Sequence, residues 1–195
     1  LRPGYEISHI TDIGLVGTFR TSLQADLYNV DQTDNPRVSP DAESTVTGRL
    51  LPRATVDVRY PFVRSTGPVR QLIEPLVMVT ATPNGQNSKN IPDEDSAVYE
   101  ADDTNLFSQD RLPGGDRVES GQRIAYGVRL GAYGSGDGRT TAFLGQSYRF
   151  SDDRELNDNN LIEEDFSDLV GRLEVKPNKY ADIVYRFAFD VDEGF

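Results

Sequence analysis

The sequence predicts an all-β fold, a section of an antiparallel up-and-down transmembrane β-barrel, on three observations. Seven stretches alternate apolar and polar residues with the two-residue period of a strand. The connections between them alternate long and short, as in barrels that carry loops at one end and tight turns at the other. Because a barrel strand needs only every second residue to be apolar, the mean hydropathy of −0.53 is compatible with this fold.

The first two predicted strands are long and clearly two-sided. A weak strand over 4–11 precedes them, and a short turn near Asp12–Gly14 joins it to the strand over 15–30. In 15–30 the odd-numbered positions are mainly apolar and the even-numbered positions mainly polar. The next strand, 46–62, repeats this arrangement, and its Pro52 lacks a backbone donor, which predicts a bulge or weak point there.

The remaining five strands differ in how clean their alternation is. The strand over 69–82 has one apolar face and one mixed face, and the mixed face carries Leu72, Glu74, Leu76 and Met78. Alternation is clearer in four strands over 118–133, 139–150, 168–177 and 180–191, although Phe143 stands among the polar residues of 139–150. Each run is long enough to supply the roughly 9–11 residues that cross a bilayer at a tilt.

The connections divide into two groups with different charge. The long ones are predicted as surface loops at about 31–45, 83–117 and 151–167, and the short ones at 63–68, 134–138 and 178–179. Serial antiparallel strands bring all the long connections to one end of the sheet. With Asp168 included, these loops hold 20 acidic and five basic residues, whereas the whole chain has a net charge of −12. The acidic residues are therefore concentrated at one rim, and the rest of the chain has a small net positive charge.

The polar face predicts a hydrophilic lumen. Its lumen-facing candidates are charged side chains at alternate strand positions: Arg20, Asp26, Arg49, Arg53, Asp57, Arg59, Glu74, Arg123 and Arg129. Two roles are open for the arginines, because they either pair with acids of the wall or bind anions.

No feature of the sequence indicates catalysis, a cofactor or a metal centre. The chain has a single histidine and no cysteine, so neither a Ser-His-Asp catalyst nor a thiolate site is supported. Acid clusters in the loops, such as Asp93–Asp95 and Glu163–Asp165, are expected to be solvated, with divalent-cation binding as the alternative. The acidic balance also argues against nucleic acid as a partner.

Three motifs occur in order along the longest connection and its C-terminal flank: Ile91–Ser96, Asp103–Phe107 and Gly115–Gly121. Leu51-Pro52, Ile73-Glu74-Pro75 and the run from Leu144 to Arg149 extend the series to about 50–150. In order and spacing, the series resembles the LptD-type lipopolysaccharide (LPS) assembly family, also called organic solvent tolerance protein.

The resemblance implies an outer-membrane barrel of about 26 strands in a Gram-negative bacterium, of which this chain is an internal section of seven or eight strands. It further implies a translocon that inserts LPS into the outer leaflet, surrounded by outer-membrane lipids. An LptE-type lipoprotein would plug its lumen, and a periplasmic bridge would deliver the LPS. The 83–117 connection is too long for a simple turn and is predicted to cap the barrel mouth. The residues expected to form this cap are Ile91, Pro92, Asp93, Glu94, Asp95, Ser96, Asn105, Leu106 and Phe107.

Two alternatives remain open from the sequence. One is a self-contained outer-membrane barrel of about eight strands. The other, from a different class, is a soluble acidic β-sandwich that binds sugar or calcium. Detergent dependence separates the sandwich from a membrane wall section, because a sandwich stays monomeric in plain buffer whereas a wall section aggregates there through its apolar face and open edges.

Overall fold

The computed structural model describes residues 2–30, 45–85, 87, 91, 102–112, 114–134, 136, 138–150 and 165–190. These residues form nine strands: β1 (Gly4–Ile10), β2 (Val16–Val30), β3 (Thr45–Arg59), β4 (Phe62–Thr66), β5 (Val69–Thr82), β6 (Gly121–Tyr133), β7 (Arg139–Arg149), β8 (Leu169–Asn178) and β9 (Ala181–Phe189). No helix among them is long and apolar enough to cross a membrane.

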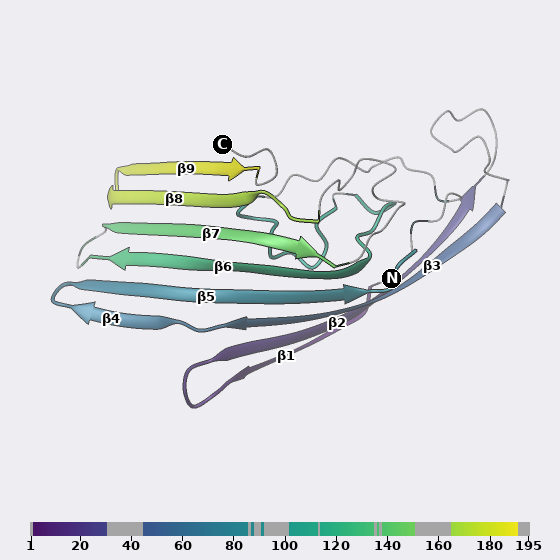
Figure 1. Ribbon diagram of the computed structural model, residues 1–195, viewed down its shortest axis with the longest axis horizontal. Coiled ribbons are helices and arrows are strands. Elements are labelled where there is room, and N and C mark those ends of the chain that lie inside the picture. The colour runs from purple at the N-terminus through teal and green to yellow at the C-terminus, as the bar shows by residue number, and fades with distance from the viewer. Residues whose placement is uncertain are drawn as a thin grey trace.

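All nine strands belong to one antiparallel sheet in which chain neighbours lie side by side (Figure 1). The order is β1-β2-β3-β5-β6-β7-β8-β9, with β4 paired to β5. The all-β, antiparallel prediction is confirmed. The described sheet is open, with β1 and β9 as its two edges.

β3 and β4 lie end to end along β5, so the strand predicted over 46–62 is interrupted near its end and continues into the connection predicted over 63–68. Both lie along β5, with Arg59 opposite Leu76 and Phe62 opposite Ile73. The ladder breaks between them at Pro61 and Pro75, because neither proline has an N–H to donate. The connection predicted over 63–68 is therefore wrong: β4 occupies most of it, and the turn is confined to Gly67, whose φ is +56°, and its neighbour.

The bulge predicted at Pro52 is also wrong. The register between β2 and β3 runs unbroken past this residue, with Leu23 opposite Pro52. On its other side β3 pairs with β5 only from Ala54 to Arg59, so Pro52 lies beyond that pairing. A strand with an open side tolerates a proline without distortion.

The start of β6 differs from the prediction for a physical reason. The strand begins at Gly121 rather than at Val118, and Gly121 has φ +89°, a left-handed conformation that favours glycine. This kink directs residues 118–120 away from the ladder. Val118, Glu119 and Ser120 are all buried outside the strand.

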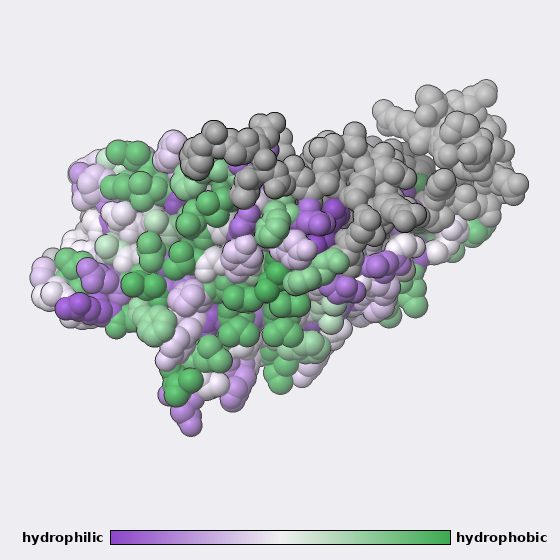
Figure 2. Space-filling model, in the orientation of Figure 1, coloured by the Kyte–Doolittle hydropathy of each residue, from purple (hydrophilic) through white to green (hydrophobic). Residues whose placement is uncertain are grey.

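The two faces of the sheet have inverted burial. In β5 the apolar Ile73, Val77 and Val79 remain 53%, 40% and 42% exposed, whereas Glu74 and Thr80 on the other face are buried. The same inversion continues across the sheet, where exposed hydrophobic residues include Leu23, Leu50, Val56, Leu130, Leu144 and Leu173. Figure 2 shows hydrophobic side chains gathered across the strands on the surface in view. We call these two surfaces the apolar face and the polar face.

The hydrophobic core lies on the polar face, under the connection between β5 and β6. Leu106 of this connection packs with Met78, Ala125 and Val170, and all four are at most 1% exposed. Phe107 and Phe143 pack against the cluster, with ring centroids 6.0 Å apart. Fully burying one leucine contributes about 1.5–3 kcal/mol. The core therefore holds the connection on the sheet rather than joining two sheets.

Candidate functional site

The candidate site is the polar face together with the covering segment, which we define as residues 102–112 and 114–120. Leu106 of the covering segment packs over Gly145 on β7, which lies directly opposite Gly127 on β6. A Cβ atom on Gly145 would lie 2.8 Å from Leu106 Cδ2, and one on Gly127 would lie 2.6 Å from the Leu144 carbonyl oxygen. The two glycines therefore form a notch in the sheet that a larger residue would fill.

Two arginines of the polar face hold the backbone of the covering segment. Arg123 donates to the carbonyl oxygens of Leu106 at 3.1 Å and Ser108 at 2.7 Å. Arg49 donates to the carbonyl oxygens of Gly115 and Asp116, both at 2.7 Å. The carbonyl groups of a loop have no hydrogen-bond partner in a β-ladder. These charge-assisted hydrogen bonds therefore provide the donors that a neighbouring strand would otherwise provide.

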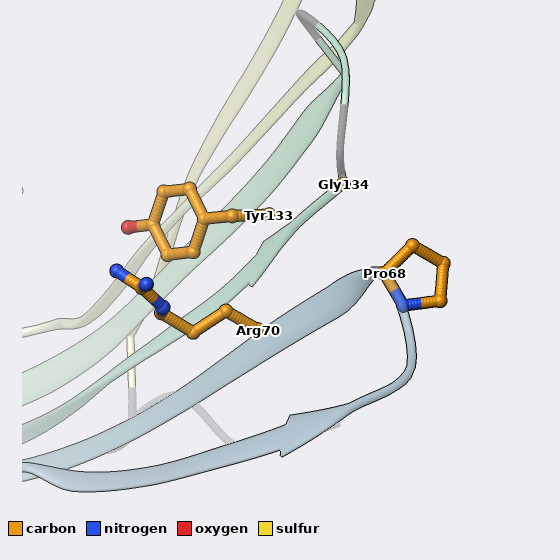
Figure 3. A pocket seen from close by; sticks show the side chains of 4 residues that line it. All are labelled: Pro68, Arg70, Tyr133 and Gly134. Carbon is orange, nitrogen blue, oxygen red and sulfur yellow. The ribbon is translucent and has the colours of Figure 1, made fainter.

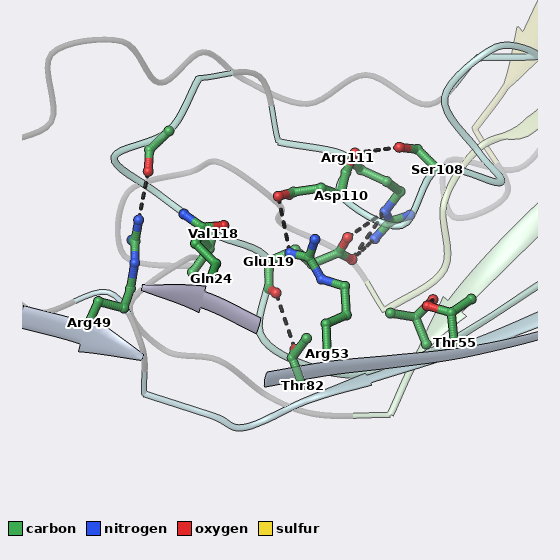
Figure 4. Close-up of polar contacts among 12 residues, drawn as sticks. Gln24, Arg49, Arg53, Thr55, Thr82, Ser108, Asp110, Arg111, Val118 and Glu119 are labelled. Atoms are coloured by element: carbon green, nitrogen blue, oxygen red, sulfur yellow. Dashed lines mark hydrogen bonds and ion pairs between the residues drawn. The ribbon is translucent and has the colours of Figure 1, made fainter. Parts of the chain in front are cut away.

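A buried ionic cluster lies between the covering segment and the sheet (Figure 4). Arg111 donates its Nε to both carboxylate oxygens of Glu119, at 3.1 and 3.0 Å, and its Nη1 to Ser147 Oγ at 2.8 Å. Arg123 Nε lies 3.1 Å from Glu119 Oε1, and Arg53 Nη2 lies 3.0 Å from Asp110 Oδ2. The cluster thus ties three residues of the covering segment to β3, β6 and β7.

The cluster controls the ionisation of Glu119. Burial alone raises the pKa of this carboxyl, but the charges of Arg111 and Arg123 and the hydrogen bond from Arg111 outweigh it and lower the pKa from 4.5 to about 2. Glu119 is therefore ionised at neutral pH although its side chain is only 7% exposed.

Two further contacts fix the end of the covering segment next to β6. Asn87 exchanges hydrogen bonds with the backbone of Val118, donating to its carbonyl at 2.9 Å and accepting from its N–H at 2.8 Å. Thr82 Oγ1 donates to the carbonyl oxygens of Glu119 and Gly121, both at 3.2 Å. These bonds satisfy backbone groups that the kink at Gly121 removes from the ladder.

The other end of the covering segment is fixed by adjacent aspartates. Asp102 Oδ1 accepts hydrogen bonds from the N–H groups of Thr104 and Asn105, at 2.7 and 2.8 Å, which closes a tight turn. Asp103 lies between Arg172, at 3.3 Å, and Arg186, at 2.9 Å. Because Arg172 and Arg186 are directly opposite on β8 and β9, Asp103 offsets a like-charge pair.

The structure separates the predicted lumen-facing residues into two groups. Arg49, Arg53 and Arg123 contact the covering segment, and Asp26 pairs with Arg49 at 2.7 Å. The others pair within the sheet: Arg20 with Asp57 at 3.2 Å, and Arg129 and Arg59 with Glu74 at 3.4 and 3.9 Å. All nine lie on the polar face, but the structure does not bring them together in one site.

The predicted cap residues also divide. Leu106 is fully buried, Phe107 is half-buried, and Asn105 Oδ1 accepts the N–H of Asp102 at 2.9 Å. Ile91 is 1% exposed. Pro92, Asp93, Glu94, Asp95 and Ser96 lie outside the described residues, as do most of the predicted loops 31–45 and 151–167.

Sequence reasoning missed the partners that the covering segment brings to the sheet: Asp103, Asp110, Arg111 and the glycine pair. One signal for them was present, because Leu76 and Met78 interrupt the polar face of β5 and Phe143 interrupts that of β7. Apolar residues on a face that otherwise contacts water indicate that something packs there. The identity of the packing segment required the fold.

The described residues contain no cluster of three or more histidine, cysteine or acidic side chains arranged to hold a metal ion. The adjacent Asp102 and Asp103 are engaged in the turn and the arginine bridge described above. The arrangement binds backbone carbonyls and carboxylates through arginines.

Comparison with known proteins identifies one family over nearly the whole chain and several relatives over a large part of it. The family model described as "LptD: LPS transport system D" matches residues 1–194. The protein named LPS-assembly protein LptD from Hahella chejuensis is 30% identical over 163 residues, which cover 77% of this chain and 20% of that protein. Its namesake from Salmonella typhimurium is 29% identical over 155 residues, covering 76% of this chain and 19% of that protein.

A third relative, LPS-assembly protein LptD from Aromatoleum aromaticum, is 32% identical over 118 residues, covering 57% of this chain and 15% of that protein. The chain therefore spans about a fifth of the length of the curated relatives it matches. Because the family model matches residues 1–194 of 195, and the open antiparallel sheet agrees with it, this chain belongs to the LptD family.

Proposed function

We propose that this chain is a wall section of an outer-membrane translocon that inserts LPS into the outer leaflet of a Gram-negative bacterium. One observation carries the proposal: the sheet exposes its apolar face and buries much of its polar face. That arrangement is inverted relative to a soluble sheet and suits a wall with lipid on one side and a hydrophilic interior on the other.

The dimensions of the strands support the same assignment. β5, β6 and β7 contain 14, 13 and 11 residues, enough for the roughly 9–11 residues that span a bilayer at a tilt. The relatives are named for LPS assembly and are about five times longer than their matched regions. We therefore assign the chain to part of one large barrel, of about 26 strands in this proposal.

The proposal orients the section in the membrane. Outer-membrane barrels carry long loops at the cell surface and short turns at the periplasm, so the β5–β6 connection belongs at the surface. There the covering segment narrows the mouth of the barrel from inside. LPS, delivered by a periplasmic bridge, enters at the short-turn end, and an LptE-type lipoprotein occupies the rest of the lumen.

Paired substitutions on β7 test the wall assignment in the full-length protein. Leu144 is 39% exposed on the apolar face, and Thr141 lies three residues away on the polar face. An arginine on the lipid side costs about 2–4 kcal/mol near the bilayer midplane. L144R is expected to lower the amount of folded protein in the outer membrane and the LPS at the cell surface, whereas T141R is tolerated beside Glu174. Equal tolerance of both variants would contradict the wall assignment.

Photocrosslinking tests the transport role separately. A photoreactive residue in place of Arg129, on the polar face, is expected to capture LPS in living cells, and capture is expected to stop when LPS synthesis is blocked. The same residue in place of Leu144 is expected to capture membrane lipid whether or not LPS is being made. Absence of LPS capture from every polar-face position would overturn the transport role while leaving the wall assignment intact.

A further inference from the structure

A row of cations crosses the polar face at the short-turn end of the sheet. Arg70 on β5 lies opposite Tyr133 on β6, Tyr133 lies opposite Arg139 on β7, and Arg139 lies opposite Lys176 on β8. Directly opposed residues point to the same face and lie about 5 Å apart at Cβ. Three positive charges and one aromatic ring therefore form a continuous row across four strands, which we call the rim row.

Acidic residues neutralise the rim row only in part. Glu174 pairs with Arg139 at 3.0 Å and with Lys176 at 3.1 Å, but it also pairs with Arg172 at 2.7 Å. Asp182 adds one contact with Lys176, at 2.7 Å. Arg70 is exposed and has no ion pair within the described part of the chain. Positive charge therefore exceeds negative charge along the row.

Open space adjoins both ends of the rim row. A hollow of about 490 Å³ is lined by Pro68, Arg70, Tyr133 and Gly134, and Figure 3 shows Arg70 and Tyr133 extending from neighbouring strands along the same side of the sheet. A second hollow, of about 230 Å³, has Arg139, Lys176 and Lys179 among its lining residues.

Gly131 lies beneath the ring of Tyr133, one of the residues that line the first hollow. A Cβ atom at this position would lie 2.6 Å from the ring of Tyr133, so the ring lies directly on the glycine. Gly131 and Tyr133 are two residues apart on β6, so the glycine leaves room for the ring to fold back along its own strand. Figure 3 shows the Tyr133 hydroxyl and the Arg70 guanidinium on the same side of the sheet.

We infer that the rim row binds the phosphate groups of a glycolipid as it enters the polar face from the short-turn end. Guanidinium groups match phosphate oxygens with two parallel hydrogen bonds, and the lysine adds a point charge. Tyr133 offers an apolar ring edge and a hydroxyl to the sugar that carries the phosphate. The inference rests on the proposed function, because only that function brings a phosphorylated glycolipid to this end of the sheet.

The test measures glycolipid binding by purified full-length protein in detergent. Phosphorylated lipid A and its enzymatically dephosphorylated form are compared on wild type, on R70Q/R139Q and on R64Q. Arg64 is the matched control. It is exposed at the same end of the sheet, but it lies on the apolar face, because it is two residues from Phe62 along β4. Wild type and R64Q are expected to prefer the phosphorylated form about tenfold, and R70Q/R139Q is expected to lose that preference.

The possible outcomes test the inference and the proposed function separately. If wild type binds both glycolipids equally, or if R70Q/R139Q keeps the preference, the inference is wrong and the proposed function stands. If wild type binds neither, the proposed function itself fails. R70K/R139K retains the charges and is expected to keep part of the preference, which distinguishes loss of the site from misfolding. Inorganic phosphate alone is expected to compete weakly; binding as tight as that of the glycolipid would assign the row to free phosphate instead.

Discussion

At the scale of single residues, Glu119 shows how a loop carboxylate can hold a long connection on a sheet. Its charge is buried with Arg111 and Arg123, and all three side chains are at most 7% exposed. A buried pair contributes little net stability when intact, but removal of one partner leaves an uncompensated charge that costs about 3–5 kcal/mol. Glu119 is therefore the residue whose loss releases the covering segment most directly.

The pKa of Glu119 predicts how this attachment depends on pH. The folded-state pKa of about 2 is lower than the ordinary value of 4.5, so the unfolded segment binds the proton more tightly. The stabilisation is complete above about pH 4.5 and is lost as the pH falls toward 2. Pepsin cleavage at the buried Leu106–Phe107 bond is expected to accelerate over this range in the full-length protein.

Matched variants identify Glu119 as the source of the pH effect. E119Q is expected to be cleaved faster than wild type at pH 4.5, and the ratio of the two rates is expected to fall toward one as the pH approaches 2, which cancels the change in pepsin's own activity with pH. E6Q, at a carboxylate whose side chain is 58% exposed, is expected to behave like wild type. Identical pepsin profiles for E119Q and wild type would show that the carboxylate does not hold the segment.

At the scale of elements, β8 and β9 depend on the covering segment for their charge balance. Arg172 and Arg186 are directly opposed, and Asp103 lies between them with its side chain 5% exposed. Like charges directly opposite each other on a sheet are destabilising. The covering segment therefore supplies a carboxylate that contacts both arginines, in addition to the pairing of Arg172 with Glu174 within β8.

A double-mutant cycle tests this dependence. D103N is expected to destabilise the full-length protein in denaturant unfolding, and the loss is expected to be smaller when R186Q is also present, because the repulsion is then gone. Since Arg186 is 54% exposed, solvent screening limits the expected coupling to about 0.5–1 kcal/mol. Additive effects of the two substitutions would show that Asp103 does not offset the pair.

The elements themselves were largely predictable from the sequence because a strand's period of two is a local property. The predicted strand over 69–82 matches β5, and the other boundaries differ by few residues. The two larger discrepancies arise from tertiary context. The break at Pro61 depends on Pro75 across the ladder, and the late start of β6 depends on Asn87 holding Val118. Neither Pro75 nor Asn87 can be identified as a neighbour from the sequence of the affected strand alone.

The candidate site was less predictable than the strands. Membership of one face follows from alternation, so the lumen-facing candidates share the polar face. Their partners do not follow from it, because Asp110 and Arg111 reach the sheet through a connection without a regular period. The sequence showed the arginines, but it did not show which of them would contact a loop rather than the wall.

At the scale of the whole molecule, the inverted burial and the open edges make a prediction about the isolated chain. Both edge strands offer unpaired backbone groups, and the apolar face exposes residues such as Val77 and Leu144. Residues 1–195 alone are therefore expected to aggregate in buffer and to become dispersed only in detergent. Size-exclusion chromatography with light scattering distinguishes the two states. A monodisperse monomer without detergent would instead support the soluble sandwich.

The notch formed by Gly127 and Gly145 has a consequence for the history of the sequence. A methyl group at position 145 would lie 2.7 Å from the ring of Phe143 and 2.8 Å from the tip of Leu106, so position 145 cannot become larger unless both side chains give way. The three positions should therefore have changed together in evolution. Among aligned relatives, a residue larger than glycine at 145 is expected only where positions 106 and 143 both carry smaller side chains than leucine and phenylalanine. Substitutions in the loop and in the strand would therefore be expected to occur together.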